Sequence, residues 1–133
     1  MERSLILETT FLVDLERELI KETEGAANWF LERHLQHQLY LTFTIAGELA
    51  AGPTLVKRQG WEDFLAPFRI LPMSKDVCWE YGKTYRYLRD NGMLIGSNDI
   101  WIAATALAYS LPLVTANRRH FRRVPGLAVE SYS

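Results

Sequence analysis

The fold of this protein depends most on one stretch, Gly96-Ser97-Asn98-Asp99-Ile100-Trp101-Ile102-Ala103-Ala104-Thr105-Ala106-Leu107-Ala108. It begins with polar residues typical of a helix start and continues into an apolar segment with almost no charge. A helix that is apolar on nearly every side is buried, so we expect this one in the middle of the molecule. Its first turn carries the carboxylate of Asp99, where backbone N–H groups and the helix dipole favour negative charge.

The carboxylate of Asp99 has two interpretations. Ser, Asn and Asp are common capping residues, and capping alone would explain a polar helix start. The sequence that follows favours a functional role, because Ser110-Leu111-Pro112 ends the helix and 113–115 is typical of a short buried strand. That strand stops at a second polar residue, Asn117.

Composition sets limits on size, partners and compartment. A chain of 133 residues with 48% hydrophobic content is expected to form one domain, 1–133, with a substantial core. The net charge of −1 gives no bulk attraction to nucleic acid, so any polyanion site must be a local patch. The lone cysteine, Cys78, predicts a buried thiol in a reduced, cytoplasmic compartment. We expect no membrane partner, since no segment has the apolar length to span a bilayer.

Short apolar runs alternate with helical patterns along the chain. We expect strands at 5–7, 39–43, 69–71, 113–115 and 127–129. We expect helices at 11–16, 23–38, 44–52, 61–67, 74–90 and 96–108. Thr44 is placed to cap the third of these helices. The alternation predicts an α/β fold with a mainly parallel sheet covered by helices on both faces.

Polar residues near strand ends should meet at one edge of such a sheet, beyond the carboxyl ends of the strands. Glu8 follows the first strand, Glu48 lies in the helix after the second, Asn117 follows the fourth, and Asp99 begins the helix before it. Three carboxylates in one pocket repel, so without a cation at least one of them has a raised pKa. A hard divalent ion such as Mg²⁺ or Mn²⁺ resolves that conflict and activates water for hydrolysis of a phosphodiester.

These residues carry a resemblance to a known family. The chain resembles PIN-domain proteins of the VapC toxin type. Residues 5–15 are similar to the family's opening strand with its first acid, and residues 44–52 are similar to the segment with its second acid. Residues 96–121 are similar to the helix with the third acid and the strand with the fourth polar position. The resemblance implies a three-layer α/β/α sandwich around a parallel sheet. It also implies a metal-dependent endoribonuclease that is inhibited by an antitoxin protein and forms a homodimer.

The site residues can be carried over one position at a time. The resemblance implies that Glu8, Glu48 and Asp99 bind Mg²⁺ or Mn²⁺ and that Asn117 completes the catalytic set. Glu8 stands where the family has Asp and is one methylene longer, while Asn117 is neutral where Asp is common. These two departures leave an alternative: a degenerate module that binds antitoxin or RNA without cleaving it.

An RNA substrate needs a basic surface close to the site. Directly after Asn117 the sequence provides one, which we expect to contact phosphates; a solvated basic turn is the alternative. The expected RNA-binding residues are Arg118, Arg119, Arg122 and Arg123. We expect Phe121, inside this cluster, to anchor the core. The four tryptophans cannot all be central in so small a domain, although each taken singly is expected in the core.

Overall fold

The centre of the structure is a five-stranded parallel sheet. The computed structural model describes residues 3–133, in which the strands are β1 (Ser4–Leu7), β2 (Gln38–Thr42), β3 (Arg69–Leu71), β4 (Leu113–Val114) and β5 (Val129–Glu130). The strand order is β3-β2-β1-β4-β5, and every neighbouring pair is parallel. The carboxyl ends of all these strands therefore lie along one edge, which confirms the mainly parallel sheet expected from the sequence.

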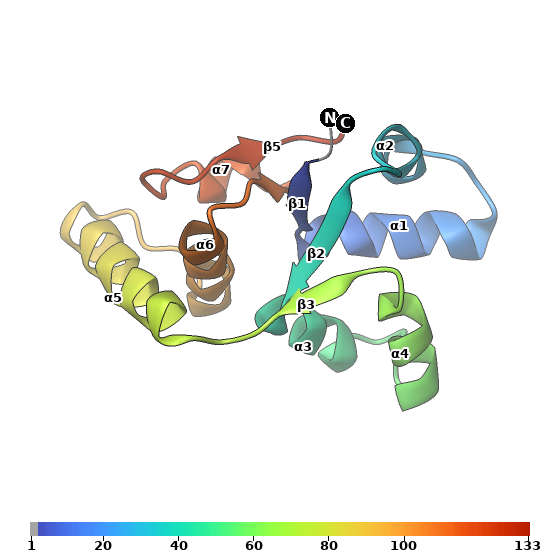
Figure 1. The fold of residues 1–133 in the computed structure, drawn as a ribbon, viewed down its shortest axis with the longest axis horizontal. Helices are drawn as coiled ribbons and strands as arrows, with labels where there is room; N and C mark the ends of the chain where they lie inside the picture. Colours follow the sequence, from blue (N-terminus) through green and yellow to red (C-terminus); the bar gives the residue numbers. More distant parts are fainter. Residues whose placement is uncertain (1–2) are drawn as a thin grey trace.

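Helices cover both faces of this sheet. In the described residues they are α1 (Thr9–Lys21), α2 (Ala26–Arg33), α3 (Phe43–Ala51), α4 (Arg58–Leu65), α5 (Lys75–Asp90), α6 (Ser97–Tyr109) and α7 (Arg118–Phe121). Figure 1 shows α1 and α2 to the right of β1 and β2, and α5 and α6 to their left. The arrangement is the α/β/α sandwich that the resemblance implied.

Helix α6 occupies the centre, as its sequence predicts. Ile100 and 102–106 are buried, and α6 packs along α5. The helix ends at Ser110, whose φ of 56° is the left-handed conformation that terminates many helices. Its N-cap is Gly96, and no side chain caps it. Asp99 therefore does not act as a capping residue here.

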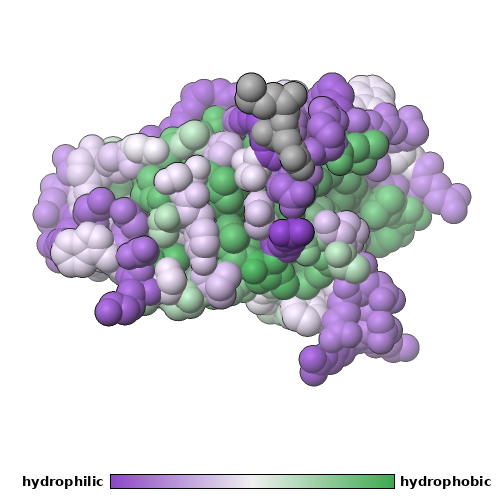
Figure 2. Space-filling model, viewed as in Figure 1, coloured by the Kyte–Doolittle hydropathy of each residue, from purple (hydrophilic) through white to green (hydrophobic). Residues whose placement is uncertain are grey.

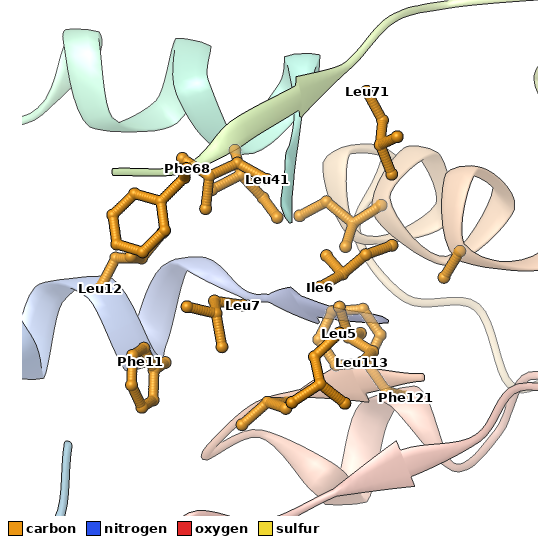
Figure 3. Packing of buried hydrophobic residues seen from close by; sticks show 14 of the residues in the cluster. Leu5, Ile6, Leu7, Phe11, Leu12, Leu41, Phe68, Leu71, Leu113 and Phe121 are labelled. Atoms are coloured by element: carbon orange, nitrogen blue, oxygen red, sulfur yellow. The ribbon is translucent and has the colours of Figure 1, made fainter. Parts of the chain in front are cut away.

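The core is built around β1. Leu5, Ile6 and Leu7 are fully buried. Figure 3 shows them surrounded by apolar side chains from other strands and from helices, with Phe121 among them. Full burial of one such side chain contributes about 1.5–3 kcal/mol. Phe121 is thus the core anchor expected inside the basic cluster.

Several element boundaries differ from the sequence-based expectations. Helix α1 begins earlier and ends later than 11–16, because the Glu8 carbonyl already accepts the N–H of Phe11 and the helix continues to Lys21. Helix α2 ends at Arg33, well before Gln38. Thr44 was the wrong capping residue for α3: β2 ends at Thr42, whose hydroxyl accepts the N–H of Ile45 at 3.2 Å.

Some side chains expected in the core lie at the surface. Cys78 is exposed, because α5 buries only the face that carries Val77 and Leu88. Trp29 and Trp79 are also exposed, so the expectation that the tryptophans cannot all be central is correct. Figure 2 shows hydrophilic residues over α4, at lower right, and apolar residues exposed in the middle of the same face. No helix within residues 3–133 is both long enough and apolar enough to cross a membrane.

Candidate active site

Glu8 emerges from the buried end of β1. Its backbone N–H donates to the Val114 carbonyl at 2.9 Å, which fixes it beside the end of β4, and only 4% of the residue is exposed. The same carboxylate oxygen, Oε1, accepts the hydroxyls of Thr10 at 2.7 Å and Thr115 at 2.5 Å. A buried carboxylate without such donors would cost several kcal/mol. Two hydroxyl groups thus satisfy the hydrogen-bonding need of the Glu8 carboxylate and orient it.

The two threonines are themselves held by the backbone after β4. The N–H of Ala116 donates to the Thr10 hydroxyl at 2.9 Å, and the N–H of Asn117 donates to that of Thr115 at 2.9 Å. The hydroxyl oxygens of Thr10 and Thr115 are 3.3 Å apart. One hydrogen-bond network therefore joins the start of α1, the end of β1 and the end of β4.

Glu48 reaches the site from α3. It lies in the second turn of the helix capped by Thr42 and is half-buried. Its Oε1 accepts the hydroxyl of Thr9 at 2.6 Å, so the first residue of α1 orients this second acid. The adjacent hydroxyls of Thr9 and Thr10 thus bind two different carboxylates.

Asp99 faces these acids from the first turn of α6. It is half-buried, and no hydrogen bond or ion pair to its carboxylate forms within residues 3–133. Burial raises the pKa of Asp99 to about 6, with further contributions from the charges of Glu8 and Glu48; His120 acts in the opposite direction. The rise agrees with the expectation that one acid of the group would have a raised pKa. All three carboxylates are therefore within electrostatic reach of one another.

The fourth expected residue, Asn117, is the N-cap of α7 and lies three residues after the end of β4. Its side-chain amide donates to Nδ1 of His120 at 3.1 Å. His120 is close enough to Asp99 to lower its pKa. His120 lies within the basic cluster but was not among the site residues expected from the sequence. Its spacing of three residues from Asn117 across a helix start was the signal that could have indicated it.

The basic cluster is divided by its contacts. Arg119 and Arg122 are exposed to solvent, and Arg118 is half-buried. Arg123 turns back instead: its Nη1 lies 3.3 Å from the Leu94 carbonyl and 3.4 Å from that of Met93. Arg123 therefore supports the loop before α6, and the other arginines remain available to a ligand.

The donor set suits a hard cation, although the site is open. Among residues 3–133, no three His, Cys, Asp or Glu side chains are close enough to enclose a metal ion as they stand. Carboxylate and amide oxygens are nevertheless the ligands that Mg²⁺ and Mn²⁺ prefer, and these ions keep several waters. Mutual repulsion at Asp99 is what such a cation would relieve. The residues present therefore fit a divalent ion that retains part of its water shell.

Comparison with known proteins agrees with this geometry. The sequence pattern described as PIN domain matches residues 5–127, so the chain belongs to the PIN-domain family. Within that family it belongs with the VapC proteins. It is 30% identical to a Ribonuclease VapC of Rickettsia bellii over 133 residues, covering 94% of this chain and 93% of that protein. It is 28% identical to Ribonuclease VapC1 of Methanocaldococcus jannaschii over 120 residues, covering 88% of each.

Solved structures show the same fold. The crystal structure of VapBC2 from Rickettsia felis, bound to a DNA fragment from its promoter, superposes with a TM-score of 0.81 at 26% identity and covers 98% of this chain and 99% of that one. The structure of VapBC-1 from nontypeable Haemophilus influenzae gives 0.81 at 25% identity, covering 97% and 98%. The family and the fold expected from the sequence are both confirmed.

Proposed function

We propose that this protein is the toxin of a toxin–antitoxin pair and that it cleaves RNA as a metal-dependent endoribonuclease. The observation that carries the proposal is the convergence of Glu8, after β1, with Glu48 of α3 and Asp99 of α6 at one edge of the sheet, where burial and the charges of the two glutamates raise the pKa of Asp99. The VapC relatives, which are named ribonucleases, support the same activity. They do not favour the alternative of a module that binds without cleaving.

Glu8, Glu48 and Asp99 would hold Mg²⁺ or Mn²⁺ in this proposal. When bound, the ion polarises the phosphate and lowers the pKa of a coordinated water. Glu8 and Glu48 arrive oriented by the hydroxyls of three threonines. Asp99 supplies the charge that is least compensated in the free protein.

Asn117 and His120 would act beside the acids. The Asn117 amide is oriented by its hydrogen bond to His120, which leaves its carbonyl oxygen to position an ion or a water molecule. Because the amide oxygen of Asn117 is neutral, the site has only three acidic ligands. We infer that this site binds one ion firmly and a second only when substrate phosphate contributes ligands.

The RNA strand would enter over α7. Arg118, Arg119 and Arg122 follow Asn117 directly, so phosphates contacted by their guanidinium groups would lie next to the acids. Such contacts position a strand without reading its sequence and weaken steeply with salt. Arg123, assigned to the same role from sequence, is already engaged by carbonyls.

The partners follow from the relatives. The solved VapBC structures are toxin–antitoxin complexes, and we propose that this chain likewise binds a cognate antitoxin. We also propose that it forms a homodimer, as the family resemblance implies. We place its activity in the cytoplasm, where RNA is accessible. The antitoxin would protect the cell by covering the acidic edge or the arginines beside it.

The test is cleavage of mixed cellular RNA by purified, antitoxin-free protein, with Mn²⁺ binding measured by calorimetry on the same samples. We expect Asp99→Asn to lower cleavage by about 100-fold or more and to abolish tight Mn²⁺ binding. Asp76→Asn is the matched control, because Asp76 is a first-turn acid of another helix, α5. Full activity in the Asp99→Asn protein would contradict the proposed mechanism.

A further inference from the structure

Tyr132, which follows β5, packs over the first turn of α1. It is 6% exposed, and its ring meets Phe11 edge-on with centroids 4.8 Å apart. Its hydroxyl donates to the carboxylate of Asp14 and lies 3.4 Å from the backbone carbonyl of Thr10. Burial and the bond to Asp14 raise the pKa of Tyr132 above its ordinary value, so the phenol remains a donor at neutral pH.

No side chain caps the first turn of α1, so its position depends on the contacts of its own residues, among them the bond from Thr9 to Glu48 and the burial of Phe11. Its N-cap is Glu8, whose side chain makes no capping bond and is directed to the site instead. Yet this turn carries Thr10, which donates to Glu8 and accepts the N–H of Ala116. Any displacement of the turn would therefore move the hydroxyl away from the carboxylate.

The segment around β5 also supports the second hydroxyl that binds Glu8. The N–H of Thr115 donates to the Glu130 carbonyl at 3.0 Å, and β5 pairs with β4 through Val114 and Glu130. Two residues later, Tyr132 contacts Thr10. The same short segment thus contacts both threonines that hold Glu8.

We propose that Tyr132 is a positioning residue: its hydroxyl fixes the first turn of α1 so that Thr10 holds Glu8 in the geometry required for cation binding. Tyr132 contacts neither the cation nor the RNA. The inference rests on the proposed role of Glu8 as a ligand.

The first measurement is amide hydrogen exchange on metal-free protein, comparing wild type with Tyr132→Phe, which removes only the hydroxyl. We expect exchange at the Ala116 amide to rise about tenfold, since its acceptor Thr10 becomes less firmly held. Exchange at the Met93 amide, bonded to Leu88, should not change. The matched control is Tyr109→Phe, because the Tyr109 hydroxyl also donates to a backbone carbonyl, that of Pro72.

The second measurement is Mn²⁺ affinity by calorimetry on the same proteins. We expect Tyr132→Phe to weaken binding about tenfold while Tyr109→Phe leaves it unchanged. In a Thr10→Ala background, adding Tyr132→Phe should weaken binding by less than about twofold more, because both changes remove the same support. Asp14→Asn, which weakens the acceptor of the Tyr132 hydroxyl, should reproduce the effect in part.

The outcomes separate this inference from the proposed function. Unchanged exchange at Ala116, or losses of affinity that multiply in the double variant, would overturn the role of Tyr132 while leaving the nuclease proposal intact. A wild-type protein that binds no Mn²⁺ would instead overturn the proposed site, and with it the functional part of the inference.

Discussion

The two sides of the acidic site hold their carboxylates in different ways. On the β1–α1 side, Glu8 accepts two hydroxyls and Glu48 accepts one. On the α6 side, Asp99 receives no hydrogen bond from residues 3–133, and its pKa is raised to about 6. The fold alone orients the carboxylates on the first side, whereas on the second side the proposed cation would compensate a charge that receives no hydrogen bond.

Burial explains why only one side needs donors. Glu8 is nearly inaccessible to water, and an unsatisfied buried carboxylate is too costly to keep. Asp99 is half-buried, so water can solvate part of it in the free protein. A first-turn position on α6 also places it near backbone N–H groups, which favour its charged form.

The largest effect that would sharpen this comparison comes from Thr115→Val. We expect cleavage to fall about 10- to 100-fold, because Glu8 loses one of its two donors. Stability should fall by about 1–3 kcal/mol, because the N–H of Asn117 loses its acceptor. Cleavage assays and denaturant unfolding would measure both effects.

Two variants control the Thr115 experiment. Thr115→Ser keeps the hydroxyl and should recover most of the activity. Thr105→Val changes another buried threonine, whose hydroxyl donates within α6 to the Trp101 carbonyl, and should leave cleavage nearly unchanged. Equal losses from both Val variants would mean that the hydroxyls on Glu8 have no special role.

An effect of intermediate size concerns the pH dependence on the α6 side. The folded pKa of Asp99, about 6, lies above the ordinary value of 3.8, so the folded state binds this proton more tightly than the unfolded state. The penalty for its charge is therefore absent below about pH 4 and fully present above about pH 6. At pH 7.5 the metal-free Asp99→Asn protein should be more stable than wild type by about 1–2 kcal/mol, allowing for solvent screening.

Urea unfolding at pH 4 and pH 7.5 would measure this difference. The advantage of Asp99→Asn should disappear at pH 4, where the wild-type carboxyl is protonated too. Saturating Mn²⁺ at pH 7.5 should reverse its sign, because the ion stabilises only the protein that binds it. If the Asp99→Asn protein without metal were less stable than wild type at both pH values, the ionised Asp99 carboxylate would not destabilise the folded state.

The smallest effect separates two arginines next to the site. Arg122→Ala should weaken RNA binding a few-fold and leave stability unchanged. The slope of the logarithm of the binding constant against the logarithm of salt concentration should become shallower by the amount that one phosphate contact contributes. Arg123→Ala should instead lower stability by about 1 kcal/mol, because the Met93 and Leu94 carbonyls lose a charged donor. Filter binding at two salt concentrations and thermal unfolding would distinguish them. Interchanged results would show that Arg123, not Arg122, contacts the RNA.

Much of the fold and part of the site could be predicted from local sequence. The apolar runs at Leu5-Ile6-Leu7 and in α6 predict burial of these segments. This prediction depends only on the residues within each segment. Strands alternating with helices predict a parallel sheet, and a parallel sheet places Glu8, Glu48 and Asn117 at one edge. Asp99 was added as the first-turn acid of the helix before β4, and the roles expected of these residues came from the resemblance to the family.

What the sequence could not supply is which hydroxyl meets which carboxylate. Glu8 is held by Thr115, 107 residues away, and Thr10 is supported by Tyr132, 122 residues away. Thr44 and Cys78 were misjudged for a related reason, since strand register and helix rotation decide what a side chain faces. The sequence by itself determined the layers and the edge where the acids gather, because periodicity is a local property. Only the tertiary structure decided how each acid is held, because hydrogen bonds between distant segments depend on ångström-scale packing.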